Sequence, residues 1–185
     1  MELMETLALN QISADDILQK SGISKGSMYH HFTDLDELLE TAQVARFAHW
    51  VDVSINNMSQ IIRAAKSKEE LFEALRVVTE NTQSVKRRPS RIERASALSK
   101  RNANPRYKEL IGKESDRLMS GLEDLARESQ EKGYFTKMHH PRTIAMMVQA
   151  YTLGKIVDDY SHKPVPDDEW NALIMDLVRK VFMQD

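Results

Sequence analysis

The sequence predicts an all-α protein, in which a small N-terminal three-helix unit is joined by a long helix to a larger helical part. Apolar residues recur at alternating spacings of three and four along most of the chain, as they do in amphipathic helices. Six Gly and five Pro in 185 residues interrupt the chain rarely, which favours long helices. With 41% hydrophobic and 29% charged residues, the composition is that of an ordinary soluble globular protein with a sizeable core.

Two short helices joined by a glycine turn are predicted near the N-terminus. Ser13 followed by Asp16 is a helix-capping pattern, and Gly22 supplies a left-handed residue at which that helix can end. Ser24 caps a second helix over residues 25–31. Three apolar residues are expected to face inward from this region: Ile23, Met28 and Phe32. The pattern is a helix-turn-helix, whose second helix can enter the major groove of DNA.

A long helix is predicted to follow the helix-turn-helix. Asp34 and Glu37 form a capping pattern before it, and no Gly or Pro interrupts the chain as far as Ile62. Its apolar stripe consists of Val44, Ala48, Val51, Ile55, Met58 and Ile62. The stripe indicates core packing, and a helix shared by both parts of the chain could also carry motion from a ligand pocket to the helix-turn-helix.

The middle of the chain is basic. Ser67 with Glu70 caps a helix that is expected to reach about Ser84. Between Ser84 and Arg117 there are eleven basic and four acidic residues, and Pro breaks occur in the same stretch. The first interpretation is a solvated basic surface. Attraction to nearby DNA and a cradle for an anionic ligand, such as a phosphate-bearing thioester, are the alternatives.

Three further helices are predicted, over residues 105–133, from Arg142 to about Ser161, and from Asp167 onwards. The apolar face of the last helix is broader than monomers usually expose. With the preceding helix it could form half of a four-helix bundle, completed by a second copy of the chain. The residues predicted at this dimer interface are Leu153, Ile156, Val157, Tyr160, Trp170, Leu173, Ile174, Leu177, Val178 and Val181.

The stretch Gly22-Ile23-Ser24-Lys25-Gly26-Ser27-Met28-Tyr29-His30-His31-Phe32, followed by Asp36-Glu37-Leu38-Leu39, resembles the signature of the TetR family of transcriptional regulators. The resemblance implies a helix-turn-helix DNA-binding domain over residues 1–45, with a short first helix at residues 1–9. It implies a helical ligand-binding and dimerisation domain over residues 46–185. It also implies a homodimer that binds a double-stranded DNA operator and a small-molecule effector. We expect a repressor released by that effector, with activation by the same geometry as the other possibility.

The resemblance also assigns residues to the DNA. These are Ser13, Lys25, Gly26, Ser27, Tyr29 and His30. Lys25 would bond guanine acceptors, Gly26 would let the helix backbone approach the duplex, and the hydroxyl groups would contact phosphates. Against this, residues 1–45 hold two basic and eight acidic residues, which is unfavourable for phosphate contacts. The alternative function is therefore a TetR-like dimer that binds a small molecule or a protein partner, with weak or lost DNA binding.

The larger part of the chain should hold the ligand site, because large apolar and sulfur side chains on facing helices suit an apolar pocket. The candidate lining residues are Phe47, Trp50, Phe72, Met119, Met146, Met147 and Tyr151. The sequence does not indicate which ligand binds.

Other functions are disfavoured by the composition. Without cysteine there is no thiolate metal site, disulfide or cysteine nucleophile. The adjacent His30 and His31 diverge by about 100° on a helix, so they would not converge on one metal ion. No nucleophile motif or phosphate-binding loop is present, so neither an enzyme nor a cofactor is predicted. No apolar run is long enough to cross a membrane, and residues 1–10 are unlike a secretory signal, so the protein is expected in the cytoplasm.

Overall fold

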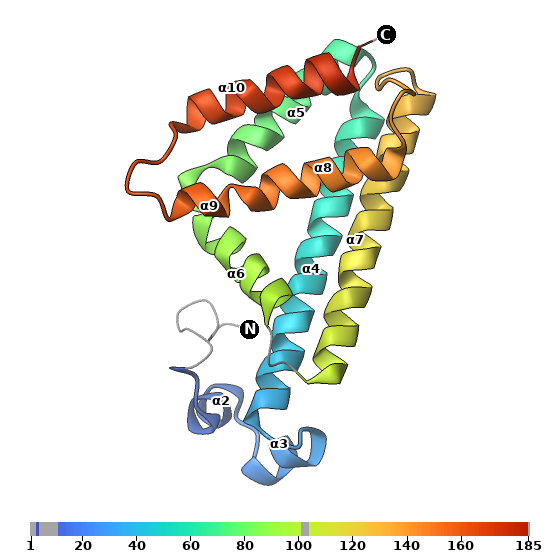
Figure 1. Ribbon diagram of the computed structural model, residues 1–185. Helices are drawn as coiled ribbons and strands as arrows, with labels where there is room; N and C mark the ends of the chain where they lie inside the picture. The colour runs from blue at the N-terminus through green and yellow to red at the C-terminus, as the bar shows by residue number, and fades with distance from the viewer. Residues whose placement is uncertain (1–2, 4–10, 101–103, 185) are drawn as a thin grey trace.

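The computed structural model describes Leu3 and residues 11–100 and 104–184, and within these every regular element is a helix (Figure 1). The predicted first helix lies outside the described residues, apart from Leu3. The elements are α2 (Ala14–Ser21), α3 (Lys25–His31), α4 (Leu35–Ala64), α5 (Lys68–Gln83), a short 3-10 turn η2 (Val85–Arg87), α6 (Arg88–Ser99), α7 (Pro105–Glu131), α8 (Pro141–Gly154), α9 (Ile156–Asp159), α10 (Asp167–Leu177) and a π-helical turn η3 (Val178–Phe182).

The helix-turn-helix is confirmed, together with the residues that bound it. Ser13 Oγ accepts a hydrogen bond of 3.2 Å from the Asp16 amide, and the Asp16 carboxylate accepts one of 2.9 Å from the Ser13 amide. Gly22 ends α2 with a φ of 71°, a left-handed conformation that favours glycine. Ser24 caps α3. Ile23 was predicted to face inward, but it lies in the turn between α2 and α3 and is 43% exposed.

Two long helices, α4 and α7, form the axis of the molecule and run side by side in the same direction (Figure 1). Gly121 on α7 makes their close approach possible, since a Cβ atom there would lie 2.6 Å from Ile55 Cδ1 on α4. At the far end of the pair, Lys132 Nζ donates to the carbonyl of Ile62 at 2.9 Å, and the Tyr134 hydroxyl donates to that of Ala65 at 2.9 Å. The C-terminal end of α4 is thereby fixed to the segment that follows α7.

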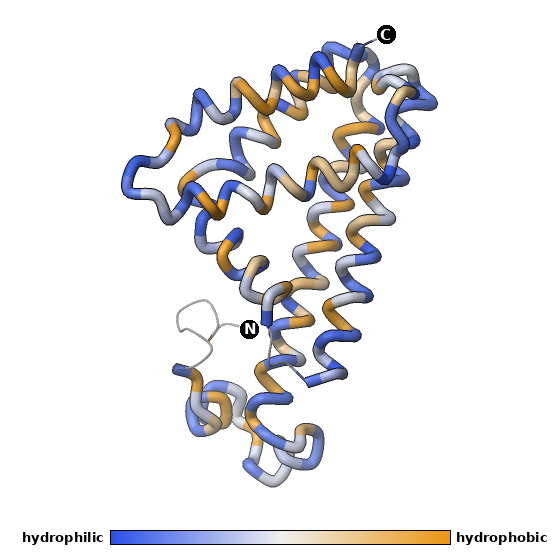
Figure 2. The backbone as a smooth tube through the Cα atoms, viewed as in Figure 1, coloured by the Kyte–Doolittle hydropathy of each residue, from blue (hydrophilic) through white to orange (hydrophobic). Residues whose placement is uncertain are grey.

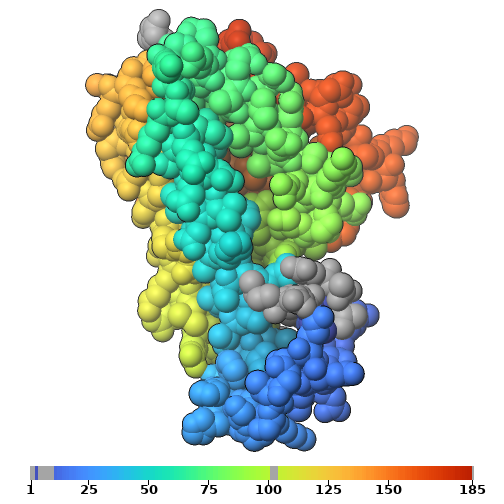
Figure 3. All heavy atoms as spheres, turned by 180° about the vertical axis from the view of Figure 1, so that it is seen from behind, coloured from blue at the N-terminus to red at the C-terminus, as the bar shows by residue number. Residues whose placement is uncertain are grey.

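The helix-turn-helix lies at one end of the molecule, and the remaining helices pack around the other end of α4 and α7 (Figure 3). Apolar and polar positions alternate along α7 and α10 in the pattern of amphipathic helices (Figure 2). The larger core lies between α4, α5, α7, α8 and α10, and the smaller one between α4, α6 and α7. None of the helices in the described part of the chain combines the length and apolar character of a membrane span.

Two elements differ from the sequence prediction. The stretch 84–117 contains a separate helix, α6, whose first turn accommodates Pro89 because that position needs no amide hydrogen. The helix predicted to reach Ser161 ends instead at Gly154, and α9 continues at an angle. At the break, the buried Lys155 ammonium group contacts Asp158 at 3.2 Å and Asp167 at 3.4 Å. These ion pairs join the start of α9 to the first turn of α10.

Candidate nucleic-acid interface and ligand cavity

The exposed face of α3 is the candidate nucleic-acid interface. Met28 is only 1% exposed and anchors the helix from below. The residues assigned to DNA all lie on the surface: Ser13, Lys25, Gly26, Ser27, Tyr29 and His30. Ser24 Oγ accepts from the Ser27 amide at 3.1 Å, which fixes the first turn of α3. The result is a short helix that presents one cation and several hydroxyl and imidazole groups to the solvent.

Within the part of the chain that the structure describes, a side chain added at Gly26 would disturb no packing. A Cβ atom at this position would have a single neighbour within 4 Å, Ser24 Oγ at 3.9 Å. Its φ does not require glycine either, since the only positive φ values occur at Gly22 and Gly133 in the described chain. Inside a helix glycine is less favourable than alanine by roughly 0.5–1 kcal/mol. The contacts of the described residues therefore do not explain the small residue at this exposed position.

The acidic charge of the N-terminal part is partly engaged in local contacts. Asp16 and Asp34 cap α2 and α4. The Glu37 carboxylate accepts from the Thr33 side chain at 2.6 Å and its backbone at 2.8 Å, and these bonds hold the pKa of Glu37 below its usual value. Glu40 is buried and pairs with Lys100 Nζ at 2.9 Å.

Basic residues from the middle of the chain meet this acidic region in space. Besides Lys100, Arg106 Nη1 lies 2.6 Å from Glu37, and the Asn104 amide donates to Glu40. The net charge of residues 1–45 therefore overstates the negative charge around α3, because two of the nearby carboxylates are paired with cations that lie beyond residue 45 in the sequence.

The interpretation of residues 84–117 as a solvated basic surface is wrong for two arginines of α6. Arg91 has no exposed surface, and its guanidinium group donates to Asp159 at 2.6 and 2.7 Å and to the carbonyls of Thr82 and Ser84. The ion pair joins α6 to α9. Arg94, one turn later, is 9% exposed and lies in a different environment.

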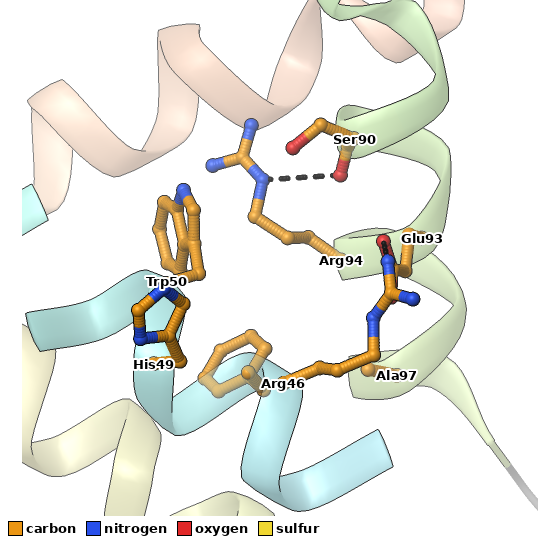
Figure 4. Close-up of a pocket in the computed structure, with 8 residues that line it drawn as sticks. Arg46, His49, Trp50, Ser90, Glu93, Arg94 and Ala97 are labelled. Carbon is orange, nitrogen blue, oxygen red and sulfur yellow. Dashed lines mark hydrogen bonds and ion pairs between the residues drawn. The ribbon is translucent and has the colours of Figure 1, made fainter. Parts of the chain in front are cut away.

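A cavity is present between α4 and α6 at the smaller core (Figure 4). One compartment, of about 230 Å³, is lined by Arg46, Phe47, His49, Trp50, Ser90, Glu93, Arg94 and Ala97. A second, of about 170 Å³, is lined by Phe47, Trp50, Arg94, Leu98, Ser115, Leu118, Met119, Gln149 and Leu153. Phe47, Trp50 and Arg94 belong to both compartments, so the two form adjoining parts of one site.

The Arg94 side chain reaches from α6 across this cavity towards Trp50 (Figure 4). Its Cζ lies 4.3 Å from the centre of the Trp50 ring, and its Nε donates to the Ser90 carbonyl at 3.3 Å. Among the described residues no carboxylate pairs with it. Glu93 points to Arg46 instead and binds that guanidinium group through two contacts, of 2.7 and 2.9 Å. Burial, with a smaller effect from Arg91, lowers the pKa of Arg94 to about 10, so the group remains charged at neutral pH.

The predicted ligand-lining residues lie in three places: in the cavity, in the larger core and on the surface. Phe47, Trp50 and Met119 line the cavity. Tyr151 lines a separate apolar void of about 70 Å³ in the larger core, and Phe72 packs against the Arg179 guanidinium group at 4.1 Å.

Met146 and Met147 are 57% and 39% exposed, so their prediction as lining residues is wrong. The stripe on α8 has two apolar sides, and these residues lie on the outer one. The prediction also missed Arg94 and Leu98, because α6 was not recognised as a helix. The spacing Arg91, Arg94 and Leu98 is the helical signal that marks their face.

The predicted dimer residues are not all available to a partner. Ile174 and Val178 are 1% and 5% exposed and belong to the core of their own chain, which corrects their assignment to the interface. Trp170 packs against the same core and donates to Gln83 at 3.1 Å. The predicted interface residues with the largest exposure are Val157, Tyr160, Leu173 and Val181. The remaining three, Leu153, Ile156 and Leu177, are half-buried.

Solved structures share this arrangement of helices. A TetR/AcrR-family transcriptional regulator from Thermobifida fusca matches with a TM-score of 0.64 at 15% identity, over 99% of this chain and 93% of that one. The chain has the TetR fold. The same fold is found in a putative regulator from Saccharomonospora viridis solved with choline (TM-score 0.69, 15% identity, 99% and 93% covered). It is also found in FadR from Bacillus subtilis in complex with stearoyl-CoA (TM-score 0.64, 14% identity, 97% and 93% covered).

The sequence itself matches no family model and no curated protein. The similarity of this TetR-fold chain to known proteins therefore lies in its three-dimensional structure and in the short motif around α3.

Proposed function

We propose that the protein is a homodimeric, ligand-responsive transcriptional regulator of the TetR family, and that it acts as a repressor released from its operator by a small molecule. The observation that carries the proposal is the face of α3, where Lys25, Ser27, Tyr29 and His30 are exposed above the buried Met28. Structures of the same fold are transcriptional regulators, and two of them hold stearoyl-CoA and choline. A regulator of this kind would work in the cytoplasm and would not be an enzyme.

In this function residues 1–45 contact DNA, and residues 46–185 bind the ligand and the second copy. Lys25 offers a cation to guanine acceptors, and Ser13, Ser27 and Tyr29 offer hydroxyl groups to phosphates. Gly26 supports the proposal because no contact or backbone conformation among the described residues requires a glycine there. An exposed glycine allows the helix backbone to approach a duplex closely.

The second copy would pack on the outer face of α8, α9 and α10. Met146 on α8 and Val157 on α9 are exposed there, and Leu173 and Val181 are exposed along the last helices. An apolar surface of this extent favours burial against a partner. A two-fold dimer would place two α3 helices on one side of the duplex, which requires a separation of about 34–36 Å.

The cavity belongs to the ligand-binding part and is lined by α4, the helix that leads to α3. Phe47 and Trp50 belong to α4, whose first turn directly follows the helix-turn-helix. Arg94 and Ala97 belong to α6, whose C-terminal neighbour Lys100 is bound to Glu40 on α4. A ligand that fits one arrangement of α4 and α6 better than another shifts the protein towards that arrangement. The spacing of the two α3 helices changes with it.

The test is binding of the purified protein to DNA from around its own coding region, at low and moderate salt. The variant carries Lys25→Ala and Tyr29→Ala, and the control carries Lys113→Ala and Arg76→Ala, two exposed cations that pair with neighbours on their own helices. We expect specific binding that weakens as salt rises and is lost in the variant but not in the control. Binding equal in both variants would contradict the proposed interface.

No specific binding at low salt would favour the alternative function, a TetR-like dimer that binds a small molecule or a protein partner without DNA. This alternative is motivated by the excess of acidic residues in the N-terminal part, where residues 1–45 hold two basic and eight acidic residues.

A further inference from the structure

Arg94 is a buried cation that has no anionic partner among the described residues. Its side chain is aimed into the cavity between α4 and α6, and only one of its nitrogens, Nε, has a hydrogen-bond acceptor among the described residues. Buried polar groups are normally satisfied, and a buried charge is normally paired. Arg91 follows this rule one turn away, where all three nitrogens of the guanidinium group donate. The contrast identifies Arg94 as a group with unused donors.

The surroundings of Arg94 define what would satisfy it. A guanidinium group presents a planar fork of donors that matches the two oxygens of a carboxylate. Glu93, the nearest acidic side chain along the chain, is bound to Arg46 through two contacts and neutralises that second cation. The cavity therefore holds one cation whose charge is not compensated, which matches a ligand with one negative charge better than a phosphate ester with about two.

Most of the side chains that line the second compartment are apolar, and Ser115 and Gln149 are its other polar members besides Arg94. Beside Arg94, the second compartment presents mainly carbon and sulfur, from Phe47, Trp50, Leu98, Leu118, Met119 and Leu153. Such a lining favours the burial of a hydrocarbon or aromatic body, because apolar surface of both the ligand and the protein is removed from water. The two compartments thus offer one charged contact and one apolar surface, and Arg94 belongs to both.

We propose that the effector is a monocarboxylic acid with an apolar body, bound with its carboxylate on Arg94 and its body among the apolar residues around Phe47 and Trp50. This inference rests on the proposed function, in which the cavity is the effector site, and it names the chemical class of the effector. Arg94 is the residue that selects an acid over a neutral or cationic molecule of the same size.

The test compares four probes with the same eight-carbon chain: octanoate, 1-octanol, octyl phosphate and octyltrimethylammonium. Binding is followed by tryptophan fluorescence, since Trp50 lies beside Arg94. We expect octanoate to bind at least tenfold tighter than octanol and octyltrimethylammonium, and tighter than octyl phosphate. In Arg94→Met the advantage of octanoate over octanol should disappear, while octanol binding stays within about threefold. Arg76→Met, which removes an exposed arginine outside the cavity, should behave as the unmodified protein.

Several results would overturn the inference. Equal binding of octanoate and octanol by the unmodified protein would make Arg94 a structural residue, and this comparison needs no variant that has to fold. Tighter binding of octyl phosphate would show that the site prefers a phosphate to a carboxylate. No binding of octanoate up to millimolar concentration would remove the cavity as an acid site. Since the assay contains no DNA, its outcome is independent of whether α3 recognises an operator.

Discussion

Replacing Arg91 or Arg94, one turn apart on α6, by methionine should change the free energy of unfolding in opposite directions. Arg91→Met removes the partner of Asp159, whose side chain is 4% exposed, and the donors to the Thr82 and Ser84 carbonyls. A buried carboxylate left without its cation typically costs about 3–5 kcal/mol of stability. We expect Arg91→Met to lower the free energy of unfolding by that amount, which is a large share of the stability of an ordinary domain.

Arg94→Met should instead raise the free energy of unfolding. The pKa of Arg94 is lowered from its ordinary value to about 10, and at 1.36 kcal/mol per pH unit the burial of its charge costs roughly 3 kcal/mol. Loss of the contact with Trp50 offsets roughly 0.5–2 kcal/mol of this. Methionine has a similar length and no charge, so we expect a net stabilisation of about 1–2 kcal/mol.

The pH dependence of this effect follows from the sign of the pKa change. The folded state holds the Arg94 proton less tightly than the unfolded state, so the penalty is fully present below about pH 10 and declines as the pH rises through that value. The difference between Arg94→Met and the unmodified protein should therefore be constant across the neutral range.

The assay is urea unfolding at pH 7, followed by circular dichroism at one fixed protein concentration, because the stability of a dimer would depend on concentration. Destabilisation of Arg94→Met to the same extent as Arg91→Met would refute the reasoning. It would mean that Arg94 has a partner in the folded state and is not available to a ligand.

Three further predictions concern other positions. Gly26→Ala should stabilise the chain by up to about 1 kcal/mol in urea unfolding and weaken operator binding at least fivefold in a DNA titration; unchanged DNA affinity would argue against close approach of α3 to the duplex. The pKa of Glu37 is lowered mainly by hydrogen bonds from Thr33, so its contribution to stability is present above pH 4.5 and lost as the pH falls through the folded pKa. In Glu37→Gln the free energy of unfolding should therefore fall less steeply with decreasing pH in this range. An equal fall in the variant and the unmodified protein would contradict this. Gly121→Val should lower the free energy of unfolding by about 1–3 kcal/mol, because the added side chain would clash with Ile55 on α4. An added Ile55→Ala should recover part of this loss. Simple additivity of the two changes would show that the two side chains do not touch.

Helix boundaries were predictable where they depend on local contacts. Ser13, Ser24, Asp34 and Ser67 each accept a hydrogen bond from an amide three residues later, so the whole interaction lies within four residues of sequence. The end of α2 at Gly22 is equally local. The same holds for the exposure of the residues on α3, which follows from the short helix and its buried Met28.

The cavity was less predictable because it depends on distant pairings. The burial of Arg91 requires Asp159, 68 residues further along the chain, and no local pattern marks an arginine as buried. Without α6, the position of Arg94 could not be inferred. Met146 and Met147 illustrate a second limit, because α8 is apolar on both sides and only its packing decides which side faces the core.

If α4 pivoted at its C-terminal end, a small displacement in the cavity would have a larger effect at α3. Lys132 and Tyr134 hold this end, and at 1.5 Å per residue Trp50 lies about 20 Å from it, whereas Leu35 lies about 43 Å from it. A rigid helix that pivots at this point works as a lever with a ratio of about two. A shift of 1 Å at Trp50 would then move α3 by about 2 Å.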